Sequence, residues 1–249
     1  MKQVESVRIT TIVDNDVHRE GLESIWGLSF YVETFSEDEK HVVLMDASGS
    51  FPAFSNNASK LGLDLSEVEV VLISHWHRDH FGALNQALSS IGRPTPVYVP
   101  SEDAVGIREI KEANGIPSVC SKPVEFIDGL MSTGELPIGI SEHSLIINLN
   151  KGLVVLTGCS HPGVINILER AQKVSGVDEI YAVIGGFHIS SISEGISVGE
   201  FLHKSDVKLV SPCHCTSVDA KKEIAKILGG RYVKNGSGKI ILIDSQIAC

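Results

Sequence analysis

The alternation of apolar and polar positions predicts a chain that mixes strands with helices. Short apolar runs rich in β-branched residues predict buried strands. They lie at 7–13, 28–34, 41–46, 68–74, 96–100, 145–149, 152–158, 179–186, 207–212 and 239–244. Apolar residues spaced three or four apart predict amphipathic helices at 82–92, 101–115, 163–176 and 217–230. Gly115, Gly176 and Gly229–Gly230 stand where helix C-caps are expected, because glycine readily adopts the left-handed conformation that ends many helices.

The order of these elements predicts the fold class. Strands dominate the early part of the chain, and strands and helices then alternate, which favours a layered α/β fold with helices outside and sheets inside. No linker rich in glycine, proline or serine divides the chain, so we expect one domain over 1–249. The least regular segment, 115–144, is expected to form a loop or flap over a site. Residues 47–60 and 115–144 are expected to contact substrate.

Composition and charge exclude several classes of protein. The chain is 43% hydrophobic and 21% charged, which is typical of a soluble globular protein. A net charge of −10 without a run of lysine and arginine argues against a nucleic-acid partner. No apolar run approaches the roughly 18 residues of a membrane span, and the N-terminus does not resemble a signal peptide. An odd number of cysteines, five, indicates free thiols and a reducing compartment, so we expect a cytoplasmic protein. The sequence gives no oligomeric state.

The stretch SHWHRDHFG (74–82) is a candidate metal-binding segment, because it places His75, His77 and His80 at the end of a predicted strand. Burying three histidines on an apolar strand end is costly unless they have a common partner. Residues two apart in an extended segment point to the same side, which pairs His75 with His77. A helix that begins near Asp79 would turn Asp79 and His80 towards a neighbouring position. One segment would thus serve two adjacent metal ions.

Other predicted strands also end in residues that bind metal or orient a ligand. Asp46, His161, His188 and His214 each follow an apolar run. The carboxyl ends of strands in an α/β sheet line one edge, so these side chains are expected to converge on the His75–His80 segment. Imidazole and carboxylate together suit zinc, manganese or iron. Asp46 is expected to hold the histidine segment through hydrogen bonds and not to bind metal directly.

The remaining candidates have plainer interpretations. His18, His41, His143 and His203 each stand alone among polar neighbours and are expected to be hydrogen-bonded loop residues. Cys159, Cys213 and Cys215 lie next to candidate histidines. If the chain is extended at 213–215, both thiols there point away from His214. We therefore expect these cysteines to be small buried residues first and metal ligands second.

The motif HWHRDH resembles the H-x-H-x-D-H signature of the metallo-β-lactamase superfamily, and Asp46, His161 and His214 match its other motifs in order. The resemblance implies a four-layer αββα sandwich with a dinuclear metal site. It implies that His75, His77 and His161 hold one ion and that Asp79, His80 and His214 hold the other. The stretches LVVLTGCSHPGVIN (153–166), AVIGGFH (182–188) and PCHCT (212–216) are similar to one branch. That branch is named for dihydropterin-ribofuranosylaminobenzene 5′-phosphate synthase, although many members are known only as metal-dependent hydrolases.

Two features set this chain apart from the superfamily pattern. The bridging aspartate is absent, and His188 occupies its place, as in that branch. The stretch between GELP (134–137) and LIINL (145–149) is shorter than the resemblance to this branch leads us to expect. Two divalent ions with Asp79 would leave a charge of about +3, or +2 with a bound hydroxide, which favours an anionic small-molecule substrate.

We therefore predict a metal-dependent hydrolase that uses metal-bound hydroxide, with two divalent ions, zinc favoured and manganese or iron as alternatives. Asp79 and His188 are the candidate catalytic residues. His188 would contact substrate or protonate the leaving group. Four alternatives stay open: a transferase that displaces pyrophosphate, iron-dependent oxygen chemistry, non-catalytic ligand binding, and a tRNA-processing nuclease, which the charge disfavours.

Overall fold

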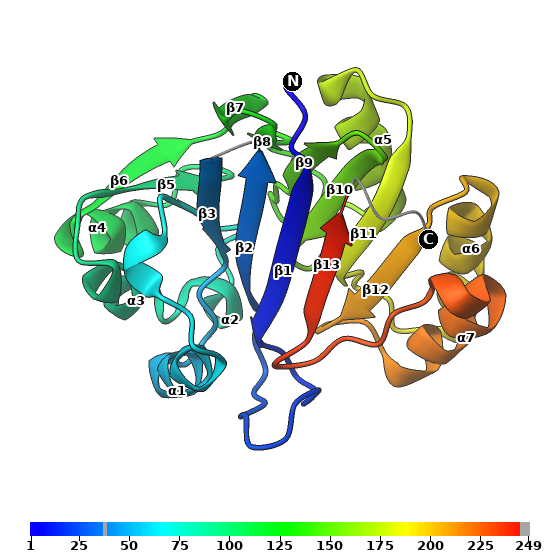
Figure 1. Ribbon diagram of the computed structural model, residues 1–249, viewed down its shortest axis with the longest axis horizontal. Helices are drawn as coiled ribbons and strands as arrows, with labels where there is room; N and C mark the ends of the chain where they lie inside the picture. The colour runs from blue at the N-terminus through cyan, green and yellow to red at the C-terminus, as the bar shows by residue number, and fades with distance from the viewer. Residues whose placement is uncertain (37–38, 245–249) are drawn as a thin grey trace.

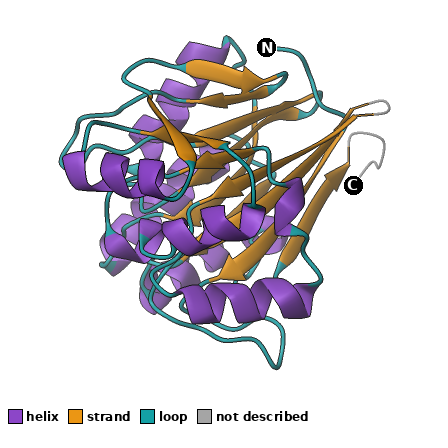
Figure 2. Ribbon diagram, turned by 90° about the vertical axis from the view of Figure 1, so that its left-hand side faces the viewer, coloured by secondary structure: helices purple, strands orange, loops and turns teal. Residues whose placement is uncertain are grey.

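Two β-sheets pack face to face, and helices cover the outer faces of both (Figures 1 and 2). The structure is a computed structural model and describes residues 1–36 and 39–244, so Cys249 lies outside the described residues. The αββα arrangement implied by the motifs is confirmed. Among the described residues, no helix combines the length and the apolar character that a membrane crossing requires.

The first sheet contains seven strands in the order β13-β1-β2-β3-β4-β5-β6. Their bounds are β1 Ser6–Val13, β2 Ser29–Ser36, β3 Glu39–Met45, β4 Val70–Leu72, β5 Thr95–Val99, β6 Gly115–Val119 and β13 Ile240–Asp244. The second sheet contains six strands in the order β12-β11-β10-β9-β8-β7. These are β7 Val124–Ile127, β8 Leu130–Ser132, β9 Leu145–Leu149, β10 Gly152–Thr157, β11 Ile180–Gly186 and β12 Leu209–Cys213.

The helices divide between the two outer layers. The first sheet is accompanied by α1 (Phe51–Leu61), α2 (Arg78–Phe81), α3 (Leu84–Ile91), α4 (Ala104–Glu112) and the short 3₁₀ helix η1 (Leu65–Glu67). The second sheet is covered by α5 (Val164–Ser175), α6 (Ile192–Lys204) and α7 (Val218–Leu228), which η2 (Gly229–Arg231) follows.

Alternation along the strands produces three apolar layers. On β2, Phe30 and Val32 face the second sheet, whereas Tyr31 packs towards the helices of the first layer. Successive side chains of a strand point to opposite faces, so a strand with helices on one side and a sheet on the other is apolar on both. This explains why the strand-forming runs are almost continuously hydrophobic.

The ten strands expected from the apolar runs are all present, but the expectation for 115–144 is partly wrong. This segment contains β6, β7 and β8 and is not an irregular loop. Its strands are short, and β6 and β7 lie at the sheet edges, where partial exposure weakens the apolar signal. Its expected place over the site stays a prediction. Gly115 is not a C-cap either, because Asn114 takes the positive φ of 66° and Gly115 begins β6, packed against Ile110.

Candidate metal centre

The candidate ligands gather at one edge of the two sheets. Helix α2, which contains Asp79 and His80, lies in the lower half of Figure 1. Strands β3, β4 and β5 run parallel, and so do β10, β11 and β12. Their carboxyl ends carry, in chain order, Asp46, the His75–His80 segment, His161, His188 and His214. The structure therefore brings together residues that are far apart in the sequence.

His75, His77 and His161 form the first group. Each offers one ring nitrogen, and the three nitrogens lie within 4.8 Å of one another. His75 Nε2 lies 3.1 Å from His77 Nδ1. The ring centroid of His161 lies 4.6 Å from that of His75 and 4.9 Å from that of His77.

Asp79, His80 and His214 form the second group. His80 Nε2 lies 3.1 Å from His214 Nε2, and Asp79 Oδ2 lies 3.3 Å from the same His214 atom. The ring centroids of His75 and His80 are only 4.1 Å apart, so the two groups adjoin.

Oxygen atoms on the far side of the rings fix which nitrogen faces the centre. Nδ1 of His80 contacts Asp46 at 2.6 Å, and Nδ1 of His214 contacts the Asn15 side-chain oxygen at 3.0 Å. Carboxylate and amide oxygens only accept hydrogen bonds, so each Nδ1 carries the hydrogen. In the neutral ring Nε2 then presents a lone pair.

This arrangement fits a divalent cation. The Nε2 lone pairs of His80 and His214 face each other at 3.1 Å, and two such lone pairs repel unless a positive charge lies between them. Zinc ligands at about 2.0–2.1 Å in tetrahedral geometry stand about 3.3 Å apart. The donor set and spacing therefore suit zinc or a similar ion.

Asp46 organises the histidine segment. Its Oδ1 accepts a hydrogen bond from the Ser74 amide at 2.7 Å, and its Oδ2 accepts from Ser74 Oγ at 2.8 Å as well as from His80. Ser74 Oγ in turn contacts His75 Nδ1 at 2.9 Å. Both carboxylate oxygens of Asp46 are thus engaged in hydrogen bonds to Ser74 and His80.

Glu142 is a site residue that the sequence analysis missed. Its carboxylate is fully buried and accepts hydrogen bonds from the amides of Cys159, Ser160 and His161, at 2.8–2.9 Å, and from His161 Nδ1 at 2.9 Å. It thereby fixes the His161 ring and the loop after β10. Glu142 follows no predicted strand, and no spacing along the chain distinguishes it.

Burial and neighbouring charges set the protonation of the centre. Burial opposes ionisation of Asp79, but when His80 and His214 are protonated, as they can be without a metal ion, the hydrogen bond from His214 and the charges of both rings outweigh burial and lower its pKa to about 2. Burial and the neighbouring histidines hold the pKa of His75 well below its usual value. Burial opposes protonation of His80, but Asp46 raises its pKa.

The backbone is strained where these residues leave the strands. Seven non-glycine residues of the described chain have positive φ, and five of them lie at this edge: Asp46, Ser48, Ser160, His188 and His214, at 49–64°. Non-glycine residues rarely adopt this conformation, and such strain concentrates at functional sites.

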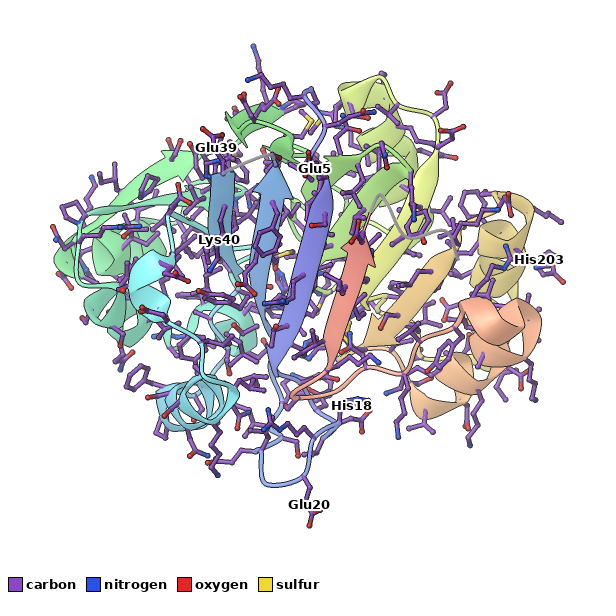
Figure 3. All side chains as sticks on the ribbon, in the orientation of Figure 1. Glu5, His18, Glu20, Glu39, Lys40 and His203 are labelled. Carbon is purple, nitrogen blue, oxygen red and sulfur yellow. The ribbon has the colours of Figure 1, made fainter. Side chains whose placement is uncertain are left out.

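The four histidines expected to be ordinary lie apart from the two groups. Figure 3 shows His203 at the margin of the molecule on α6 and His18 near the lower end of β13. His41 contacts Glu69 at 3.1 Å. His143 is hydrogen-bonded, as expected, but it is fully buried and contacts Ser132 Oγ and the Ile73 carbonyl.

The expectation of small buried residues holds for Cys213 and Cys159, whereas Cys215 is only partly buried. Cys213 is buried in the layer between the sheets. The chain is not extended at His214, whose φ is 50°, and Cys215 lies with Cys159 and His188 in one cluster. Cys159 Sγ also lies 3.3 Å from His80 Nε2.

Two hollows flank the centre. One of about 470 Å³ is bordered by His161, His188 and the first turn of α5. The other, of about 360 Å³, is bordered by His214, Lys221 and Trp26. The Trp26 side chain is 65% exposed, with its ring centroid 5.1 Å from that of His214.

Comparisons with known proteins agree with this geometry. The family model for the metallo-beta-lactamase superfamily matches residues 27–147. The 7,8-dihydropterin-6-methyl-4-(beta-D-ribofuranosyl)-aminobenzene-5'-phosphate synthase of Methanocaldococcus jannaschii is 24% identical over 286 residues, which cover 96% of this chain and 97% of the relative.

Two solved structures are also similar to this chain over nearly its whole length. Tm1679, a metal-dependent hydrolase of the beta-lactamase superfamily, has a TM-score of 0.77 and 26% identity and covers 96% of this chain and 99% of its own. A diphosphatase of the PhnP family has a TM-score of 0.64 at 14% identity and covers 97% and 99%, which indicates a shared fold alone. The resemblance predicted from the motifs is confirmed.

Proposed function

Because the chain belongs to the metallo-β-lactamase superfamily, we propose that it is a metal-dependent hydrolase with a dinuclear site that acts on an anionic small molecule. The observation that carries the proposal is the facing of ring nitrogens at 3.1 Å in both groups. Such donors, held from behind by Asp46, Glu142 and Asn15, are preorganised for cations.

Each group would hold one ion: His75, His77 and His161 the first, and Asp79, His80 and His214 the second. When bound, two divalent ions would lower the pKa of a water towards 7 and neutralise charge that develops on the substrate. Zinc fits the imidazole-rich set best, and manganese and iron remain alternatives.

Asp79 and His188 are the proposed catalytic residues. The Asp79 carboxylate, with a pKa of about 2, is ionised at neutral pH and would accept a hydrogen bond from the attacking water. His188 is exposed, and its ring centroid lies 4.5 Å from that of His161. It would contact substrate beside His161 or give a proton to the leaving group.

Charge and backbone dipoles support an anionic substrate. When Asp46 and Glu142 are counted with Asp79, two divalent ions leave a net charge of about +1, smaller than the +3 expected from the ligands alone. The first turn of α5 contains no acidic residue and borders the larger hollow. Its free amide groups and helix dipole attract anions.

A transferase that displaces pyrophosphate is the second candidate. The observation that favours it is the likeness to the dihydropterin-ribofuranosylaminobenzene phosphate synthase over nearly the whole of both chains. The same positive centre would neutralise a pyrophosphate leaving group.

Metal analysis and a substrate screen test the proposal. Protein purified without chelators is expected to contain zinc or manganese at both groups and to hydrolyse members of a panel of phosphoesters, pyrophosphates and carboxylate esters. Asp79→Asn should lose the second ion and turnover, whereas Asp178→Asn, an exposed carboxylate, should lose neither. Pyrophosphate release that requires a second substrate would favour the transferase. Bound iron would redirect the proposal to redox chemistry.

The role of His188 has its own test. His188→Ala is expected to lower kcat while the ions of the two groups remain bound. A variant that keeps those ions and full activity would remove His188 from the mechanism.

A further inference from the structure

Cys159, His188 and Cys215 form a third cluster of metal-binding side chains next to the two groups. Their donor atoms, two Sγ atoms and one ring nitrogen, lie within 4.8 Å of one another. They follow the adjacent parallel strands β10, β11 and β12. The proposed hydrolysis uses neither thiol.

Local contacts hold the two sulfur atoms together. Cys215 Sγ accepts a hydrogen bond from the His188 amide at 3.3 Å and lies 3.4 Å from the Cys159 carbonyl oxygen. Gly186 leaves space for this approach, because a Cβ there would lie 2.7 Å from Cys215 Sγ and 3.2 Å from Cys159 Cα. The strand ends are thus shaped around the sulfur atoms.

We propose that Cys159, Cys215 and His188 bind a third metal ion, a zinc, separate from the ions of the two groups. Thiolate and imidazole are typical zinc ligands. Zinc–sulfur bonds of about 2.3 Å and zinc–nitrogen bonds of about 2.0 Å separate tetrahedral ligands by about 3.4–3.8 Å. Donors that lie within 4.8 Å of one another would therefore close by at most about 1.4 Å. Both thiols release their protons on binding, and the two thiolates balance the charge of the ion.

The cluster borders open space on two sides. Cys215 borders the 360 Å³ hollow and His188 borders the 470 Å³ hollow, so the cluster lies between the two. A Cys₂His site with an open position is of the kind that binds water or substrate. An imidazole bound to this ion cannot also protonate a leaving group, so the two tasks of His188 exclude each other. The third site does not depend on which reaction the other two ions support.

Cobalt replacement tests the proposal without an activity assay. Metal-free, reduced full-length protein is titrated with Co²⁺, and near-ultraviolet absorption reports cobalt–thiolate bonds. We expect three equivalents at saturation and a thiolate charge-transfer band. Cys215→Ser and His188→Ala should each lose one equivalent, and Cys215→Ser should also lose intensity in the band. Cys120→Ser, which changes a thiol in the loop after β6, should match the unmodified protein.

Other outcomes would overturn the proposal. Saturation at two equivalents without the band would mean that the thiols bind no metal. A band that Cys159→Ser removes but Cys215→Ser and His188→Ala retain would assign the thiolate to His80 and the second group, since Cys159 Sγ lies 3.3 Å from His80. Saturation at one equivalent with the band present would mean that the two histidine groups bind no cobalt. That result would contradict the dinuclear proposal and not the third site.

Thiol protection provides a measurement that needs no variant. In the unmodified protein, zinc should slow alkylation of the partly exposed Cys215, and a chelator should restore the rate. Equal alkylation with and without zinc, or a Cys159–Cys215 disulfide in protein kept reduced, would contradict the third site.

Discussion

At the residue scale, the centre depends on side chains that bind no metal. Glu142 accepts four hydrogen bonds, and three of them come from consecutive backbone amides at Cys159, Ser160 and His161. Burial opposes its ionisation, but the hydrogen bonds from His161 and from the backbone lower its pKa. The charge of Glu142 therefore stabilises the loop after β10 as well as the position of the His161 ring.

Replacing Glu142 with glutamine removes the charge of the side chain and keeps its size. The amide nitrogen of Glu142→Gln cannot accept hydrogen bonds, so at least one pair of donors loses its partner. We expect a loss of about 1–3 kcal/mol in the free energy of unfolding and zinc affinity lowered about 10- to 100-fold. Urea unfolding and competition with a chromogenic chelator measure these. Glu200→Gln, at an exposed position of α6, is the control, and equal behaviour of the two variants would contradict the role of Glu142.

His143 makes stability depend on pH. Burial lowers its pKa to about 4, against about 6.5 in the unfolded chain. The neutral ring is satisfied, because Nε2 donates to the Ile73 carbonyl at 2.9 Å and Nδ1 accepts from Ser132 Oγ at 2.7 Å. The unfolded chain therefore binds the proton first as the pH falls.

The folded pKa is depressed, so the stability from neutral His143 is complete above about pH 6.5 and is lost as the pH falls towards 4. At about pH 4 the loss should reach about 3 kcal/mol. Urea unfolding of metal-free protein at several pH values measures it, and His143→Gln should have a smaller slope over this range. Parallel curves for the two proteins would show that His143 does not contribute.

At the element scale, the ends of the parallel strands form the site, and their packing tolerates little change. The ends of β4 and β10 meet at Gly158, where a Cβ would lie 2.1 Å from Ser74 Oγ and 3.1 Å from Glu142 Oε1. Ser74 links Asp46 to His75, so a shift here would reach both metal-binding groups.

Gly158→Ala is predicted to push Ser74 away from Asp46. We expect destabilisation of about 1–3 kcal/mol from overpacking, together with weaker metal binding. Thermal unfolding and metal content of the purified variant measure the two effects. Gly230→Ala, where the added carbon meets no atom within 4 Å, should change neither. A Gly158→Ala protein with normal stability and metal content would mean that the strand ends adjust freely.

Some elements were predictable from local pattern and others were not. Strands β9 to β12 are buried on both faces, so their apolar runs stand out in the sequence. The sequence pattern did not predict helix α6, because its glycines and the exposed Ile192 and Ile196 interrupt the amphipathic pattern. Ser191 and Glu194 nevertheless form a capping box at its start. Strands β7 and β8 are short. The edge strand β7 pairs with β8, which pairs with β9, and this pairing determines them more than their own residues do.

At the scale of the whole molecule, the site joins the two halves of the sandwich. Asp46 and the His75–His80 segment follow strands of the first sheet, and His161, His188 and His214 follow strands of the second. Ions bound between them would link the sheets, and metal binding should therefore stabilise the entire fold.

Metal removal is predicted to lower the unfolding temperature. At a free zinc concentration of about 1,000 times the dissociation constant, one site stabilises by about 4 kcal/mol. For a chain of this size that corresponds to about 8–16 °C. Calorimetry with zinc and with a chelator measures the shift, and Asp79→Asn should reduce it. An unchanged unfolding temperature would indicate that the centre does not bind zinc in the folded protein.

The sequence by itself predicted the positions of ten strands and the candidate ligand set, because apolar runs and the H-x-H-x-D-H motif are local features. Asp46, His161 and His214 were predictable because each follows such a run. The tertiary structure alone decided which residues support and extend the centre. Asn15 contacts His214 across 199 positions of the chain, and Glu142 reaches His161 from a loop without a strand pattern. Cys215 meets Cys159 only because β10, β11 and β12 lie side by side, and such contacts depend on the packing of strands that no local pattern records.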